Sequence, residues 1–145
     1  MMPKSWPAIC PKSSIPKISN MAAEHVGQDH TLGEILPYVT PKRHSKNKVR
    51  KELDGFRVSL SSDRLAVFAK SLICTQCGIT GSIFKLDLQG NSAPHLNLYA
   101  IKSDGTEMLM TKDHIVPKSK GGHDSLDNYQ TMCADCNVAK GNSHD

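Results

Sequence analysis

The sequence predicts a small α+β domain that follows a basic N-terminal arm, and three observations lead to this fold class. Two Cys-x-x-Cys pairs, Cys74/Cys77 and Cys133/Cys136, are separated by 55 residues. Between the pairs, short runs alternate apolar and polar residues, which is typical of β-strands. Before the first pair, one segment repeats apolar residues with helical spacing. The rest of the chain is interpreted around this frame.

Positive charge is concentrated in the first third of the 145 residues. Residues 1–50 contain eight Lys or Arg and three Asp or Glu, whereas residues 51–145 contain ten and eleven. Residues 1–20 hold four prolines, which disfavour helices and sheet ladders, so we expect disorder there. We therefore predict a mostly disordered basic arm over residues 1–50 and a folded domain over residues 51–145.

The end of the arm carries a dense basic run. A run of this kind contacts phosphate in some proteins and is a solvated segment in others, and both interpretations stay open. Its members lie within ten positions and are Lys42, Arg43, Lys46, Lys48, Arg50 and Lys51.

The helix and strand signals follow in order along the chain. Residues 31–39 are predicted to be a linker, and Asp54-Gly55 predicts a turn. Ser61 to Asp63 supply a cap for an amphipathic helix that should cover the first cysteine pair. Its apolar face consists of Leu65, Phe68, Ala69 and Leu72.

Four strands and one more helix are expected in the second half of the chain. Residues 83–88 and 95–101 alternate as strands, with Gly90, Asn91 and Pro94 between them. A third strand begins at residue 107 and ends at Asp113-His114. A fourth strand over residues 129–132 leads into the second cysteine pair, and a short helix is expected to begin at Cys136.

The cysteine spacing favours one structural Zn²⁺ ion bound by Cys74, Cys77, Cys133 and Cys136. A chain that is only 38% hydrophobic is typical of small folds that need such a metal. Four thiolates leave no open coordination position, so this zinc should not be catalytic. The alternative is a redox dithiol, which usually lies in a βαβ context that this sequence lacks.

Polar residues cluster where the third strand ends. Neighbouring strand residues point to opposite faces, so the strand must bend or end for Asp113 and His114 to reach one phosphate. Pro117 favours such an exit, and a basic loop follows it. Asn128 then lies just before the fourth strand, and Asn137 directly follows Cys136.

The run DHIVPKSKGG, continued by LDNYQTMCADCNVAKG and preceded by CTQCG, resembles the HNH endonuclease family of the ββα-metal type. Within that family it is similar to short zinc-bound proteins often encoded by phages. The resemblance covers Cys74 to about Gly141. It implies a treble-clef-like ββα-metal fold and a metal-dependent endonuclease that hydrolyses DNA, by nicking or double-strand cleavage. Homing, restriction and DNA packaging are the roles that it suggests.

The resemblance also implies individual roles. His114 would be the general base, Asp113 and Asn137 would hold one catalytic divalent ion, and Asn128 would tie the loop and so orient His114. Because the last motif position is Asn137 rather than His, Mg²⁺ or Mn²⁺ is expected as the ion rather than Ni²⁺ or Zn²⁺. The products would carry 5′-phosphate and 3′-hydroxyl ends. Expected nucleic-acid contacts are Lys118, Lys120, Lys140, Lys42, Arg43, Lys46, Lys48 and Arg50.

The sequence leaves several alternatives open for metal ligands, function and assembly. His123 and His144 could be further metal ligands, but exposed positions in a loop and a tail are the preferred interpretation. A zinc-stabilised nucleic-acid-binding module without turnover is the alternative function. A homodimer or docking to a larger complex, such as a phage packaging complex, is a further option. We expect DNA as the partner and no membrane, because no apolar run approaches ~20 residues. A cytoplasmic location is expected, in the host cell if the protein is phage-encoded.

Overall fold

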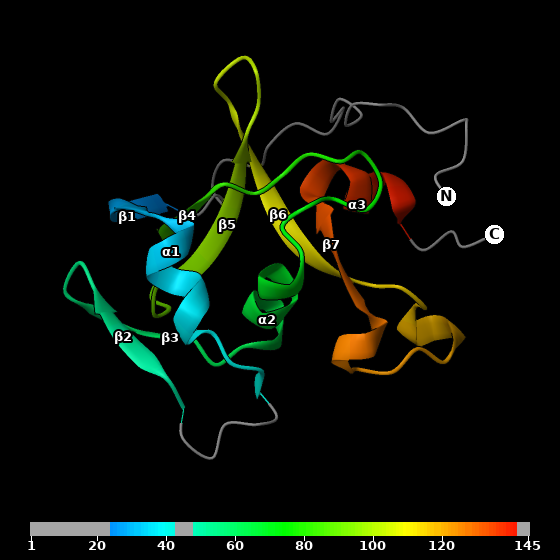
Figure 1. Cartoon of the computed structure of the whole chain (residues 1–145), viewed down its shortest axis with the longest axis horizontal. Helices are drawn as coiled ribbons and strands as arrows, with labels where there is room; N and C mark the ends of the chain where they lie inside the picture. Colours follow the sequence, from blue (N-terminus) through cyan, green and yellow to red (C-terminus); the bar gives the residue numbers. More distant parts are fainter. Residues whose placement is uncertain (1–23, 43–47, 142–145) are drawn as a thin grey trace.

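An antiparallel sheet of five strands forms the frame of the molecule (Figure 1). The computed structural model describes residues 24–42 and 48–141. The strand order is β1-β4-β5-β6-β7, so one edge strand comes from the segment expected to be an arm. The strands are β1 (Glu24–His30), β4 (Ile83–Leu88), β5 (His95–Ile101), β6 (Glu107–His114) and β7 (Tyr129–Cys133).

The central strands confirm the predicted alternation. Phe84 and Leu86 of β4 are buried and pair with Leu98 and Leu96 of β5, which are buried too. Side chains two residues apart share one face of a strand, so these residues build one apolar layer. The buried face of the sheet is therefore the main core of the domain.

Strand β6 changes partner halfway along its length. Its first half pairs with β5, up to Leu109 opposite Tyr99, and its second half pairs with β7, from Met110 opposite Cys133 to His114. Helix α3 (Ala134–Lys140) follows β7 directly and lies beside β6 (Figure 1). The predicted small α+β domain is confirmed, and β6, β7 and α3 form a ββα unit at its C-terminal end.

Helix α2 (Asp63–Lys70) confirms the predicted amphipathic helix. The Ser62 hydroxyl accepts a hydrogen bond from the Leu65 amide at 3.3 Å, which satisfies one of the free N–H groups of the first turn. Leu65 and Phe68 are buried against the core, whereas Ala69, which was expected on the same apolar face, is exposed, and Ala66 and Val67 are buried instead. The helix ends earlier than expected, because Ser71 is extended with φ −156° and leads the chain toward Cys74. Leu72 therefore lies beyond the helix.

The expected linker over residues 31–39 is wrong. Thr31 and Glu34 form a reciprocal capping box around α1 (Leu32–Ile35), and the 3-10 helix η2 (Leu36–Tyr38) follows. Ile35 is fully buried in the core. Together with β1, this segment makes residues 24–42 part of the ordered domain, so the fold begins well before residue 51. The disorder expected for residues 1–20 lies outside the described residues.

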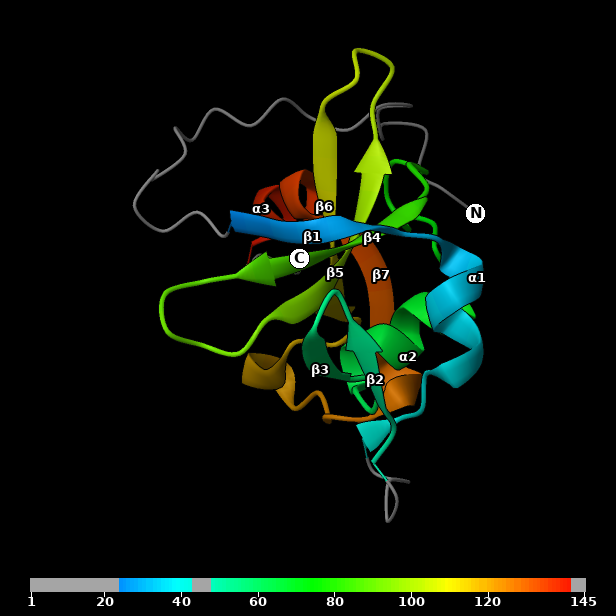
Figure 2. The same cartoon turned by 90° about the vertical axis from the view of Figure 1, so that its left-hand side faces the viewer.

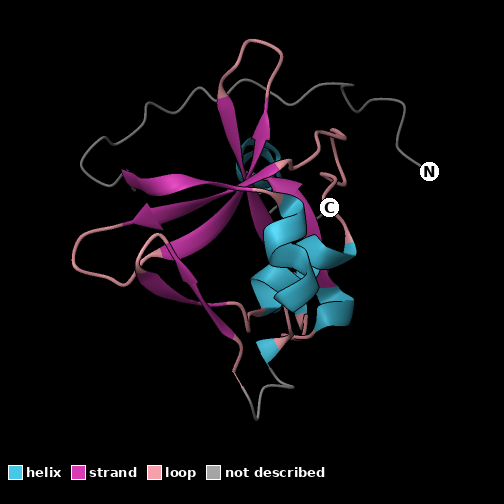
Figure 3. Ribbon diagram, turned by 60° about the vertical axis from the view of Figure 1, so that its left-hand side comes forward, coloured by secondary structure: helices cyan, strands magenta, loops and turns pink. Residues whose placement is uncertain are grey.

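A two-stranded hairpin packs beside these elements (Figures 2 and 3). It consists of β2 (Arg50–Leu53) and β3 (Phe56–Ser59), and its turn confirms the prediction at Asp54-Gly55. Both turn residues have positive φ, 53° and 85°, which matches the twist that a tight hairpin requires. No helix in the described part of the chain is long and apolar enough to cross a membrane.

His30 joins β1, α1 and this hairpin. Its side chain is 5% exposed, its Nδ1 lies 3.1 Å from Glu34, and its Nε2 lies 2.9 Å from Asp54. Burial disfavours the imidazolium, but the two carboxylates outweigh burial and raise the pKa of His30 above its usual 6.5. The protonated histidine is therefore the form that ties the N-terminal segment to the hairpin.

This arrangement predicts a pH-dependent stability. A histidine whose pKa is raised by folding binds more protons in the folded state, so its contribution is fully present below pH 6.5. That contribution is lost as the pH rises through the pKa of the folded state. The free energy of unfolding, measured by urea denaturation at a series of pH values, should decrease less steeply over this range in His30→Gln than in the unmodified chain.

The control for this series is His123→Gln, because His123 is exposed in a loop. That variant should keep the pH dependence of the unmodified chain. Parallel pH profiles for His30→Gln and the unmodified chain would show that His30 does not tie these elements together.

Candidate functional site

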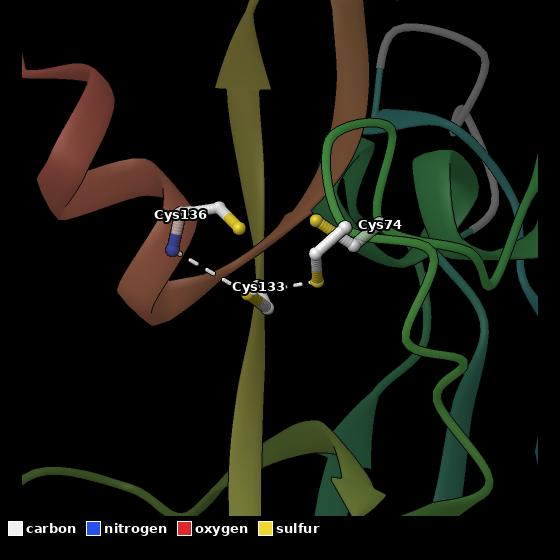
Figure 4. Close-up of side chains that lie close together, drawn as sticks. Cys74, Cys133 and Cys136 are labelled. Atoms are coloured by element: carbon white, nitrogen blue, oxygen red, sulfur yellow. Dashed lines mark hydrogen bonds between the residues drawn. The ribbon is translucent and has the colours of Figure 1, made fainter. Parts of the chain in front are cut away.

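The four predicted zinc ligands lie together in the core. One sulfur atom from each of Cys74, Cys77, Cys133 and Cys136 lies within 4.8 Å of the others, and all four residues are buried. Figure 4 shows three of these side chains, from the turn after α2 and from the junction of β7 and α3, pointing toward one another. The cluster therefore joins two segments that are far apart in the sequence.

The local backbone supports these sulfur atoms. Gly78, with φ 83°, closes the first turn by donating its amide to the Cys74 carbonyl at 3.0 Å. Helix α3 begins at Ala134, and its N-cap residue is Cys133, whose sulfur accepts the Cys136 amide at 3.4 Å. The helix was expected to begin at Cys136, so the first cysteine of the pair takes the capping role instead.

The thiols differ in acidity because one of them donates a hydrogen bond to another and all are buried. The Cys133 thiol donates to Cys74, which lowers the pKa of Cys74 to about 4 and raises that of Cys133. Burial raises the pKa of Cys136 to about 11. Several buried thiolates are favourable only beside a cation that compensates their charge. Four buried sulfur ligands therefore fit a metal such as zinc.

The last two side chains of β6, Asp113 and His114, point to opposite faces of the strand. Asp113 faces α3, where its Oδ2 accepts hydrogen bonds from Lys140 at 2.5 Å and from Gln130 at 2.9 Å. On the same side, the Asn137 amide donates to the Thr111 hydroxyl at 2.9 Å. The Lys140 ammonium thus places a positive charge beside the Asp113 carboxylate.

The His114 side chain is held by a carboxylate from the loop that follows β6. Its Nε2 lies 2.7 Å from Asp124 Oδ1, and its ring meets the edge of Tyr129 with centroids 5.0 Å apart. The hydrogen bond from His114, together with Lys118, lowers the pKa of Asp124 to about 2. Sequence reasoning missed Asp124, because no spacing rule connects a loop carboxylate with a strand residue ten positions earlier.

Asn128 closes the loop that carries Asp124. Its side chain accepts from the Val116 amide at 2.8 Å and donates to the carbonyl groups of Val116 and His123, both at 2.9 Å. The loop also contains the 3-10 helices η4 (Lys118–Lys120) and η5 (Leu126–Asn128). One amide side chain thus fixes both ends of the loop between β6 and β7.

Asp113, His114 and Asn137 line one groove of about 480 Å³. The strand end brings the first two residues to its rim from opposite faces, and α3 adds the third. Among the described residues, nothing forms a hydrogen bond with the Asn137 amide oxygen, whereas its nitrogen is engaged by Thr111. A carboxylate and an amide oxygen on one groove are a donor set that suits a hard divalent ion.

The predicted nucleic-acid contacts are placed unevenly. Lys118 and Lys120 are exposed on the loop between β6 and β7, and Lys42, Lys48 and Arg50 are exposed elsewhere. Lys140 differs from the expectation, because its side chain is only 14% exposed and pairs with Asp113. His123 is exposed and does not belong to the cysteine cluster. Arg43, Lys46 and His144 lie outside the described residues.

Loss of one cysteine should release the metal and unfold the domain. Cys133→Ser removes a ligand and also the sulfur that caps α3, so we expect less than one zinc per chain and loss of the cooperative thermal transition. Elemental analysis and circular dichroism measure both effects. Thr80→Ala, in the same turn region, should keep zinc and folding. A metal-free Cys133→Ser protein that melts like the unmodified chain would contradict the zinc assignment.

Comparison with protein families gives an independent result for this site. Residues 100–143 match the family described as HNH endonuclease, and this segment contains Asp113, His114, Asn128 and Asn137. Comparison with curated proteins and with solved structures gave no match. The family match indicates nuclease activity in general and therefore a nucleic-acid substrate. Over residues 100–143, the resemblance of this chain to the HNH endonucleases is confirmed.

Proposed function

We propose that this chain is a divalent-metal-dependent endonuclease that hydrolyses phosphodiester bonds of DNA. The observation that supports this function best is the convergence of His114, Asp113 and Asn137 on one groove. This groove lies within the segment that matches the HNH endonuclease family. An imidazole next to two oxygen donors can supply a general base and hold a metal ion for hydrolysis of a phosphodiester.

His114 is the general base in this proposal. An ionised carboxylate only accepts hydrogen bonds, so the neutral imidazole carries its proton on Nε2, toward Asp124. Its Nδ1 is then the basic nitrogen, able to take a proton from the attacking water. Tyr129 packs against the ring and limits its rotation. Asp124 is thus a positioning residue for His114.

Asp113 and Asn137 would hold the divalent ion, Mg²⁺ or Mn²⁺. When bound, the ion supplies positive charge beside the scissile phosphate and the leaving 3′ oxygen. The carboxylate of Asp113 is oriented by hydrogen bonds from Lys140 and Gln130. Thr111 holds the amide of Asn137. The zinc site contributes no chemistry in this proposal, because its four sulfur ligands complete a tetrahedral shell.

The competing function is a nucleic-acid-binding module without turnover. Binding alone would need positive charge. It would not need a histidine that is oriented by a hydrogen-bonded carboxylate and lies beside two oxygen donors. The arrangement of His114 and Asp124 therefore favours the nuclease.

The direct test is cleavage of supercoiled plasmid DNA with and without Mg²⁺. We expect nicked or linear product only with the ion, and loss of about 10²- to 10⁴-fold in rate in His114→Ala, because a general base contributes a factor of this size. The ends of the product, read by sequencing and by ligation, should be 5′-phosphate and 3′-hydroxyl.

Two further variants separate positioning from folding. Asp124→Asn keeps an acceptor for His114 Nε2 and should retain more activity than Asp124→Ala, while circular dichroism shows equal folding for both. Plasmid cleavage by a folded His114→Ala protein at the unmodified rate would refute the role of His114. Tight DNA binding by the unmodified, zinc-loaded chain without any cleavage would favour the binding module.

A further inference from the structure

A second groove, of about 990 Å³, also has His114 in its lining. One wall comes from the family-matching segment and includes Lys112, Lys118 and Tyr129. The other wall comes from outside that segment, namely from Lys42 and from residues 61–64 at the start of α2. The part of the chain that precedes the family match therefore helps to build a cavity at the catalytic histidine.

The two grooves are adjacent and share part of their lining. Lys112, His114 and Lys118 line both of them. Lys112 and His114 are two residues apart on β6 and so lie on the same face of the strand. A nucleic-acid strand with a phosphate at His114 would consequently extend from the first groove into the second.

The lining of the second groove is cationic. It contains Lys42, Arg64, Lys112 and Lys118, against two carboxylates that are already engaged. Asp63 accepts the Lys42 backbone amide at 3.0 Å, and Asp124 accepts from His114 and Lys118. Phosphate groups are the ligands that a groove of this charge recognises.

Two lysines in this groove are suited to separate phosphates. The Lys112 ammonium lies 4.2 Å from the centroid of the Tyr129 ring, which fixes its position beside His114. The Lys42 side chain is exposed on the opposite wall. Arg64 is less suited, because it donates to the Leu96 carbonyl at 2.7 Å and to Asn97 at 3.0 Å.

We propose that this second groove, between the start of α2 and the β6–β7 pair, binds the DNA backbone next to the cleaved bond. Lys112 contacts the phosphate nearest to His114, and Lys42 contacts one further along. The inference rests on the proposed nuclease function for the identity of the ligand. It adds that Lys42 and the start of α2, which the family match does not include, belong to the substrate site.

The test measures DNA binding in a His114→Ala background without divalent ion, so that cleavage does not interfere. Fluorescence anisotropy with a labelled duplex, at salt concentrations between about 50 and 200 mM, gives the slope of log affinity against log salt. Lys42→Gln and Lys112→Gln should each weaken binding several-fold and reduce the magnitude of the slope by about 0.9. The double variant should reduce it by about twice as much.

Matched variants distinguish a phosphate contact from a general loss of charge. Lys70→Gln removes an exposed lysine at the far end of the same helix and should leave the slope unchanged. Lys112→Arg keeps the charge and should keep the slope. If circular dichroism shows that Lys112→Gln does not fold, the salt slope of Lys42→Gln alone tests the proposal, because Lys42 is exposed.

The outcomes separate this inference from the nuclease proposal. Unchanged slopes in Lys42→Gln and Lys112→Gln, an equal loss in Lys70→Gln, or no duplex binding by the parent would each overturn the inference. If the unmodified chain cleaves plasmid DNA but the slopes do not change, the groove proposal is rejected and the nuclease proposal stands. Groove-dependent binding by a chain that never cleaves supports the groove and rejects the nuclease.

Discussion

The packing of four buried cysteines is the constraint on which the rest of the structure depends. Cys74 and Cys77 lie in the turn after α2, and Cys133 and Cys136 lie where β7 becomes α3. Held together, these two segments fix α3 against the end of β6. Asn137 is the residue after Cys136, so its distance from Asp113 is set by the cluster. A modest apolar core alone would leave this junction weakly restrained.

The change of partner along β6 explains how one strand serves both the core and the site. Its first half pairs with β5, whereas its second half pairs with β7, the edge strand of the sheet. Met108 and Met110 stay buried, whereas the side chains of Asp113 and His114 at the end of the strand are 12% and 25% exposed. Strand alternation sends these two side chains to opposite faces, and only at the strand end do they meet on one groove.

The sequence predicts those features of the fold and the site in which chemistry constrains the spacing of residues along the chain. The cysteine pairs, the Ser-capped helix and the alternating strands could be predicted, because each depends on residues close together in the chain or on a known ligand geometry. The N-terminal segment could not, since β1 is mostly exposed and becomes a strand only by pairing with β4. Its clearest local signal is the Thr31 and Glu34 capping box, which marks the start of α1 but not the strand before it. Asp124 and the partner of Lys140 depend on tertiary contacts that no local pattern encodes.

The central claim is that the cysteine cluster holds zinc and thereby places Asp113 and Asn137 to share a second, catalytic ion. Anomalous diffraction from crystals of the zinc-loaded protein soaked in Mn²⁺, collected at both metal edges, tests this directly. We expect a zinc peak within about 2.3 Å of the four sulfur atoms and a separate manganese peak bound by Asp113 and Asn137 beside His114. A manganese peak away from these two residues, or zinc bound outside the cysteine cluster, would contradict the account.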